Sequence, residues 1–226
     1  MNERAVMLEG LFQERYSCRG YLAQPVPRQT IESILRIAQR TASWCNSQGW
    51  QVHVASEAAT QRLRESLLSH VKTGEGKGAT DLDWPEYEGV YLQRRRECGR
   101  QLYTATGVAR GDTQAADRQR LENFRFFGAP HVALVTSDAA LGTYGAVDCG
   151  AYVNSFMLAA RAHGIACIAQ AALASQADFW RTELRLPQSR RLVCGISFGY
   201  EDAAHPANAF RTSRAPLQEV VQWVEA

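Results

Sequence analysis

The stretch GAVDCGAYVNSFMLAARAH, residues 145–163, is apolar and rich in small residues, and it predicts a helix. Gly164 follows it directly and can adopt the left-handed conformation that often ends a helix. We predict a buried strand before this helix, at HVALVT (131–136), and a short strand after it, at IACIA (165–169). Few strands interleaved with more helices indicate an α+β sandwich.

The same patterns extend outward in both directions. Helices are predicted over 3–16 and 27–41, and Pro27 suits a first helical position. WQVHVA (50–55) alternates like a half-buried strand, and Ser56 is predicted to cap the helix that follows. Toward the C-terminus we predict a helix near 175–185, a strand at RLVCGISFGY (191–200) and a tail interrupted by prolines.

Residues 74–125 interrupt this order. Four glycines fall between positions 74 and 89, and with one proline and several aromatics they predict a variable excursion with short helices of its own. GEGKG at 74–78 lacks the strand-to-helix setting of a nucleotide-binding fingerprint and is interpreted as a loop. At 226 residues the chain can bury an ordinary core, so we predict one domain over 1–226.

Composition excludes several classes of protein. With 46% hydrophobic and 21% charged residues and a net charge of +2, the chain predicts a globular protein without a nucleic-acid partner. The basic run RRR (94–96) is interpreted as a solvated helix face. Six dispersed cysteines without a C-x-x-C pair predict reduced thiols and no metal site. Acidic residues early in the chain and the lack of a long apolar run predict a cytoplasmic protein with no membrane partner.

GISFG at 195–199 matches the G-x-S-x-G pattern of serine hydrolases. In those enzymes the serine lies on a sharp turn from a strand into a helix. Here Ser197 falls inside an apolar strand, and no helical period follows. We therefore interpret Ser197 as a buried strand residue.

Two arginine clusters carry more information. RYSCR (15–19) places Arg15, Ser17 and Arg19 at alternating positions, so an extended chain would point all three side chains the same way. FRTSR (210–214) offers further arginines beside hydroxyls. Arginine binds phosphate through paired donors, so the clusters predict an anion site. SWCNSQGW (43–50) adds amides that can read the edge of a polar heterocycle.

These motifs, in this order and spacing, resemble the FMN-dependent nitroreductase family over almost the whole chain. The likeness rests on R-x-S-x-R, S-x-x-N-x-Q-x-W, APHVALVTSD, DCGAYVNSFMLAARAHGI, GISFGY and a final R-x-x-R-x-P. It is nearest to the nitrobenzoate-reductase-like branch, through SWCN and HPANAFRTSRAPLQEVVQW. The resemblance implies a three-layer sandwich, with a mostly antiparallel sheet between helices, in an intertwined homodimer with FMN sites at its interface.

The resemblance also implies roles for individual residues. Residues 15–19 would hold the flavin phosphate, ribityl chain and pyrimidine edge, residues 211 and 214 would complete the phosphate clamp, and residues 42–46 would reach the partner's flavin. Residues 171 and 172 match the backbone that faces flavin N5, and residue 125 aligns with a basic residue near N1 and O2. The implied cofactor-binding set is Arg15, Tyr16, Ser17, Arg19, Ser43, Trp44, Cys45, Asn46, Gln48, Arg125, Ala171, Ala172, Arg211 and Arg214.

The sequence departs from the family pattern at two places. Gly49 stands where proline is usual, which predicts a looser turn, and alanines occupy the N5 segment where glycine or an acid is common.

The implied function is reduction of nitroaromatics to hydroxylamines, with NAD(P)H and the acceptor visiting bound FMN in turn and with no catalytic side chain. We assign substrate choice to residues 74–125, where aromatic side chains could stack on the acceptor. The candidates are Trp84, Tyr87, Tyr91 and Tyr103. The alternatives are a quinone or enone reductase or a dehalogenase on the same scaffold, and a non-catalytic flavin-binding protein.

Overall fold

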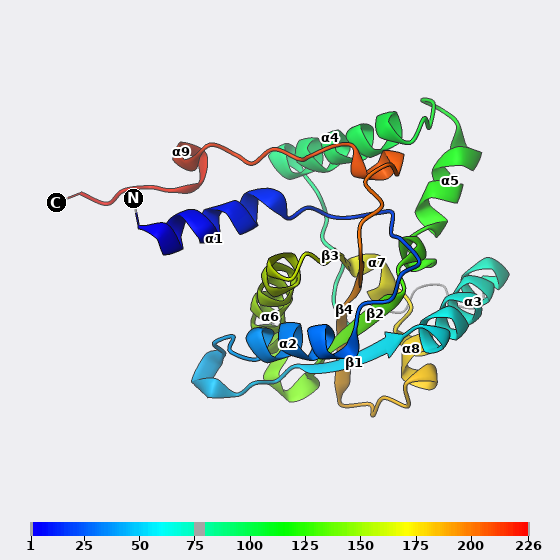
Figure 1. The fold of residues 1–226 in the computed structure, drawn as a ribbon, viewed down its shortest axis with the longest axis horizontal. Helices are drawn as coiled ribbons and strands as arrows, with labels where there is room; N and C mark the ends of the chain where they lie inside the picture. Colours follow the sequence, from blue (N-terminus) through cyan, green and yellow to red (C-terminus); the bar gives the residue numbers. More distant parts are fainter. Residues whose placement is uncertain (1, 75–79, 226) are drawn as a thin grey trace.

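The computed structural model describes residues 2–74 and 80–225, and at its centre is a four-stranded sheet (Figure 1). Its strands are β1 (Gln51–Ser56), β2 (His131–Asp138), β3 (Ala166–Gln170) and β4 (Arg190–Gly199), in the order β1-β2-β4-β3. All three neighbouring pairs are antiparallel. The sheet is therefore antiparallel throughout the described residues.

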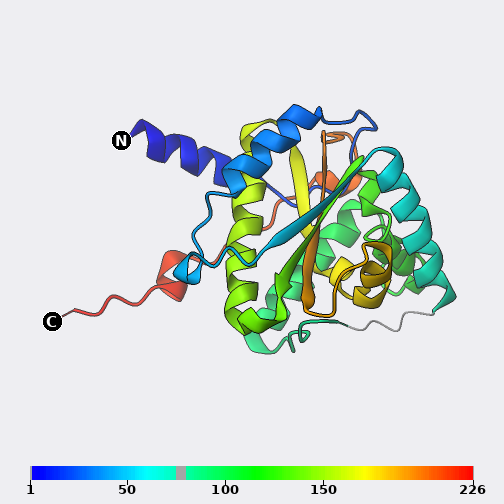
Figure 2. The same cartoon turned by 90° about the horizontal axis from the view of Figure 1, so that it is seen from below.

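Helices cover both faces of the sheet (Figure 2). On one face lie α2 (Arg28–Ala38) and α6 (Gly142–Ala162), and on the other lie α3 (Ala58–Thr73), α7 (Ala171–Ala174) and α8 (Ala177–Glu183). Strand β2 shows why, since Ala133 and Val135 pack with the first group while Val132 and Leu134 pack with the second. Successive side chains of a strand point to opposite faces of the sheet, so a strand that is apolar throughout has to be covered on both faces. The predicted α+β sandwich is confirmed.

Four further α-helices of the described residues lie outside these layers. Helix α1 (Glu3–Glu14) joins α6 through an ion pair between Glu14 and Arg161 at 3.0 Å. The predicted excursion contains α4 (Gly89–Ala105) and α5 (Thr113–Leu121), and the C-terminal tail passes beside α4 before α9 (Leu217–Val220). In Figure 1 the two termini extend away from the sandwich on the same side.

The base of the excursion is held by one carboxylate that is only 9% exposed. Asp81 accepts from Nη2 of Arg181 at 2.8 and 3.0 Å and from the backbone N–H of Leu192 at 2.8 Å. These contacts connect the start of the described excursion to α8 and β4. The predicted GEGKG loop lies almost wholly outside the described residues.

Two predicted helix starts are wrong. Helix α3 begins at Ala58 and its N-cap is Glu57, not Ser56, because β1 continues through Ser56 and pairs it with His131. Pro27 precedes the first helical residue, Arg28, and so takes the N-cap position.

Ser197 is fully buried within β4, and its hydroxyl donates to the side-chain oxygen of Gln170. The strand interpretation of GISFG is therefore confirmed. No helix in the described part of the chain is both long and apolar enough to cross a membrane.

Candidate functional site

The structure brings the two arginine clusters together, although almost 200 residues separate them in the chain. Arg15, Tyr16 and Ser17 line one side of a cavity of about 400 Å³, and Arg211 and Arg214 line the other. The predicted anion site is thus a single concave site, formed where the end of α1 meets the C-terminal tail.

Asn208 holds these two segments side by side. Its side-chain oxygen accepts from the backbone N–H of Arg19 at 2.7 Å, and its amide nitrogen donates to the carbonyls of Gly20 and Asp202, both at 2.9 Å. Asn208 is only 5% exposed, so these bonds are shielded from water. Our sequence reasoning missed this residue because two of its partners, Arg19 and Gly20, are distant in the chain and a single asparagine has no pattern.

The guanidinium of Arg211 lies over the ring of Tyr16. Its guanidinium carbon is 3.5 Å from the centre of the ring, and Nη1 donates to the carbonyls of Asn208 and Phe210 at 2.8 Å. The Tyr16 hydroxyl donates to Glu201 at 2.9 Å, which fixes the ring, and burial raises the pKa of that hydroxyl. A guanidinium stacked on a fixed ring is preorganised to bind an anion.

Arg19 is enclosed by aromatic rings. Its guanidinium carbon lies 5.9 Å from the ring centres of both Phe127 and Phe210, and Nη1 donates to the carbonyl of Ser17 at 3.1 Å. Burial lowers the pKa of Arg19, but a guanidinium still keeps its charge at neutral pH. The side chain therefore holds a positive charge in a partly apolar setting, where its electrostatic effect is less screened.

Arg15 has a buried donor group at the edge of the cavity. It is the C-cap of α1, and its backbone N–H donates to Leu11 at 3.1 Å. Its Nε is buried and has no hydrogen-bond partner among the described residues. Buried polar groups in proteins almost always have a partner, so this donor fits a phosphate bound in the adjoining cavity.

Residues 43–48 do not reach this cavity. The backbone N–H of Trp44 donates to the Asp148 carboxylate at 3.2 Å, near the start of α6, and the Trp44 ring contacts that of Tyr144 at 4.3 Å. Arg161, which contacts α1, lies thirteen residues further along α6, about 20 Å away at 1.5 Å per residue. Within one chain, this segment and the arginine cluster are therefore separate.

The backbone of this segment is strained. Cys45, Asn46 and Gln48 have φ values of 50°, 55° and 48°, a region that residues other than glycine seldom adopt. Such strain often accompanies function. Gly49, in contrast, is not in a loose turn: its carbonyl accepts from Arg190 at 3.0 Å, and a Cβ there would lie 2.1 Å from Leu141.

The other predicted cofactor residues lie at the end of β3 and beside it. Ala171 and Ala172 open α7, with Ala171 exposed and Ala172 half-buried. Arg125 is exposed and pairs with Glu122 at 3.2 Å. Buried Gln170 donates to the backbone carbonyl of Asn123 at 3.0 Å, so the end of β3 is joined to the end of the excursion.

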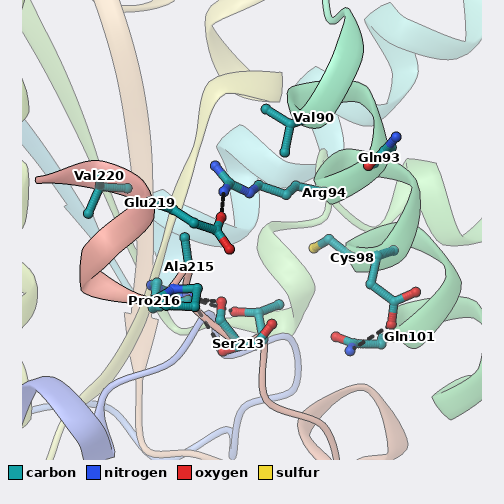
Figure 3. Close-up of a pocket in the computed structure, with 13 residues that line it drawn as sticks. Val90, Gln93, Arg94, Cys98, Gln101, Ser213, Ala215, Pro216, Glu219 and Val220 are labelled. Atoms are coloured by element: carbon teal, nitrogen blue, oxygen red, sulfur yellow. Dashed lines mark hydrogen bonds and ion pairs between the residues drawn. The ribbon is translucent and has the colours of Figure 1, made fainter.

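A second, larger cavity of about 790 Å³ lies between α4 and the tail (Figure 3). Its α4 wall includes Val90, Arg94, Cys98 and Gln101, whose spacing of four, four and three residues places them on one helix face. That spacing was the signal that our sequence reasoning missed. The predicted substrate aromatics are exposed and are not among the residues lining either cavity: Trp84, Tyr87, Tyr91 and Tyr103.

The described residues form an α+β sandwich with a concave site lined by Arg15, Arg211 and Arg214. The family model described as "Nitroreductase family" matches residues 12–200, and the chain belongs to that family.

Two curated relatives cover nearly the whole chain. The nitroreductase NfnB of Mycolicibacterium smegmatis is 36% identical over 95% of this chain and 92% of its own length. A 4-nitrobenzoate reductase of Nocardioides sp. is 32% identical, over 96% and 89%. The crystal structure of the FMN-dependent NfnB from Mycobacterium smegmatis in complex with NADPH matches with a TM-score of 0.93, over 98% of this chain and 99% of that one.

Proposed function

We propose that the protein is an FMN-dependent oxidoreductase that uses NAD(P)H to reduce nitroaromatic compounds to hydroxylamines. The observation that carries this proposal is the buried Nε of Arg15, which has no hydrogen-bond partner in the described part of the chain and belongs to a side chain that lines a cavity together with Arg211 and Arg214. Those three side chains would hold the terminal phosphate of FMN, and the hydroxyl of Ser17 adds a further donor. The names of the relatives support the choice of cofactor, electron donor and acceptor.

When bound, FMN supplies the two-electron chemistry between NAD(P)H and the nitro group. Arg19 would place its positive charge beside the pyrimidine edge of the ring, where reduction adds negative charge, and Arg125 is proposed to assist it. Ala171 and Ala172, at the end of β3, would face the ring with short side chains. No side chain needs to act as a nucleophile in this scheme.

The proposed active form is a homodimer in which residues 43–48 complete the partner's site. Two observations support this proposal. Cys45, Asn46 and Gln48 adopt strained φ values although they are exposed in the single chain. The C-terminal tail leaves apolar side chains in water, with Trp223 80% exposed and Val224 98% exposed, as an interface segment does before it meets its partner.

We further propose that 1–226 forms one FMN-binding domain, that residues 74–125 cap the acceptor site, and that the protein is cytoplasmic. The six cysteines are free, and Cys18, Cys149, Cys167 and Cys194 are buried, which fits a reducing compartment.

The test begins with the visible spectrum of the purified protein. We expect a yellow protein that releases FMN on denaturation, loses its visible absorption when NAD(P)H is added without oxygen, and regains it when nitrobenzene is added. Release of FAD as the main flavin would contradict the cofactor assignment. Bleaching without reoxidation by any nitroaromatic would contradict the acceptor assignment.

A further inference from the structure

The larger cavity has a charged pair across it. Nη2 of Arg94, on α4, lies 3.2 Å from the Glu219 carboxylate, on α9, and Figure 3 shows the two side chains reaching toward each other. Both are about half exposed, at 47% and 55%. This pair joins the excursion to the C-terminal tail.

The cavity adjoins the proposed FMN site. Thr212 and Arg214 line both cavities, so a short stretch of the tail forms the wall between them. Around the ion pair the wall is mixed, with Val90 and Cys98 beside the amide of Gln101 and the carboxylate of Glu97, which pairs with Arg100 at 2.6 Å. A flat, partly apolar molecule carrying one negative charge suits such a wall better than a highly charged one does.

We propose that Arg94 selects acceptors that carry a carboxylate, and that Glu219 is a competitor for Arg94 within the same chain. This inference rests on the proposed function. An incoming carboxylate takes the place of the Glu219 carboxylate, so Arg94 stays paired throughout the exchange. A neutral acceptor enters the same cavity without displacing Glu219.

The exposure of the pair makes this exchange feasible. Half-exposed ion pairs are weak, so the competitor reduces carboxylate binding by only about two- to fivefold. The ring of a bound acceptor would shield the contact between its carboxylate and Arg94 from water, so this contact is stronger, and its loss should lower reactivity about tenfold or more. The two substitutions therefore act in opposite directions on the same acceptor.

The experiment follows reoxidation alone, so that NAD(P)H binding does not enter. FMN-loaded protein is reduced without oxygen and mixed in a stopped-flow instrument with 4-nitrobenzoate or with its neutral analogue 4-nitrobenzamide. The second-order rate constants are compared for the wild type, Arg94→Gln, Glu219→Gln and Arg95→Gln. Arg95 is the matched control, because it carries the same charge on the same helix but lies over the Tyr87 ring at 5.4 Å.

We expect Arg94→Gln to lower the rate constant for 4-nitrobenzoate about tenfold or more and that for 4-nitrobenzamide less than about twofold. Glu219→Gln should raise only the 4-nitrobenzoate value, about two- to fivefold. Arg95→Gln should leave the ratio of the two values near that of the wild type.

Three results would overturn the inference. The first is an equal loss of rate constant with both acceptors in Arg94→Gln. The second is a change in the ratio of the 4-nitrobenzoate to the 4-nitrobenzamide rate constant in Arg95→Gln that equals the change in Arg94→Gln. The third is an unchanged ratio in every variant. Each variant is first shown to retain FMN and its melting temperature. If neither acceptor reoxidises the wild type or any variant, the proposed function has failed and not the role of Arg94.

Discussion

Replacing Asn208 by alanine should loosen the protein and its cofactor site together. The side chain makes three shielded hydrogen bonds, to the N–H of Arg19 at 2.7 Å and to the carbonyls of Gly20 and Asp202 at 2.9 Å. Each such bond contributes about 1 kcal/mol, so the variant should lose about 3 kcal/mol of unfolding free energy. For a chain of this size, that is a drop of about 6–12 °C in melting temperature.

The second consequence concerns FMN. Two of the lost bonds, to Arg19 and Gly20, join the segment that carries Arg15 to the segment that carries Arg211, so the proposed phosphate clamp should widen. We expect FMN affinity to fall about tenfold, as for the loss of one charge-assisted contact. The assays are thermal unfolding of the apoprotein and FMN titration by fluorescence. Gln188→Ala, which removes an exposed loop amide, is the control.

An apoprotein melting temperature within about 2 °C of the wild type would refute the hydrogen-bond argument. A large drop with unchanged FMN affinity would show that Asn208 stabilises the fold but does not position the clamp.

Three further predictions follow from the same structure. Arg15→Ala and Arg214→Ala should each weaken FMN binding about tenfold or more, measured by titration of the apoprotein, and unchanged affinity would contradict the clamp. Arg15→Ala and Asn46→Ala homodimers should both be inactive. Refolding the two variants together with excess FMN should restore activity at about a quarter of all sites. About half of the refolded dimers contain one chain of each variant, and each of these mixed dimers has one intact site. A remixed sample as inactive as its parents would show that residues 43–48 serve no neighbouring site. His131 is buried, and its Nε2 accepts the backbone N–H of Val26 at 2.8 Å. Burial lowers the pKa of His131 in the folded protein. Its contribution to stability should therefore be complete above about pH 6.5, the ordinary pKa of histidine, and should decline as the pH falls through the pKa of the folded state. Melting temperatures from pH 8 to 5 should therefore fall less steeply in His131→Gln than in the wild type, while His163→Gln, at an exposed position, keeps the wild-type slope.

Local patterns in the sequence were enough for the elements and their layers. The strand at 131–136 and the helix at 145–163 could be predicted because burial determines how apolar residues are spaced along a strand or a helix. Errors arose at Ser56 and Pro27, where the exact end of an element depends on pairing with a distant strand or turn. The residue types at 15–19 and 211–214 likewise indicated an anion site before any fold was known.

Only the tertiary structure decided which of these pieces meet. It joined the two arginine clusters through Asn208. It placed residues 43–48 near the start of α6, about 20 Å along that helix from Arg161. It also placed Arg94, from the basic run 94–96, opposite Glu219. Such contacts leave no periodic trace in the sequence, because each depends on the packing of segments that are far apart in the chain. Sequence therefore determined which groups are available for binding, and the fold determined which of them act together.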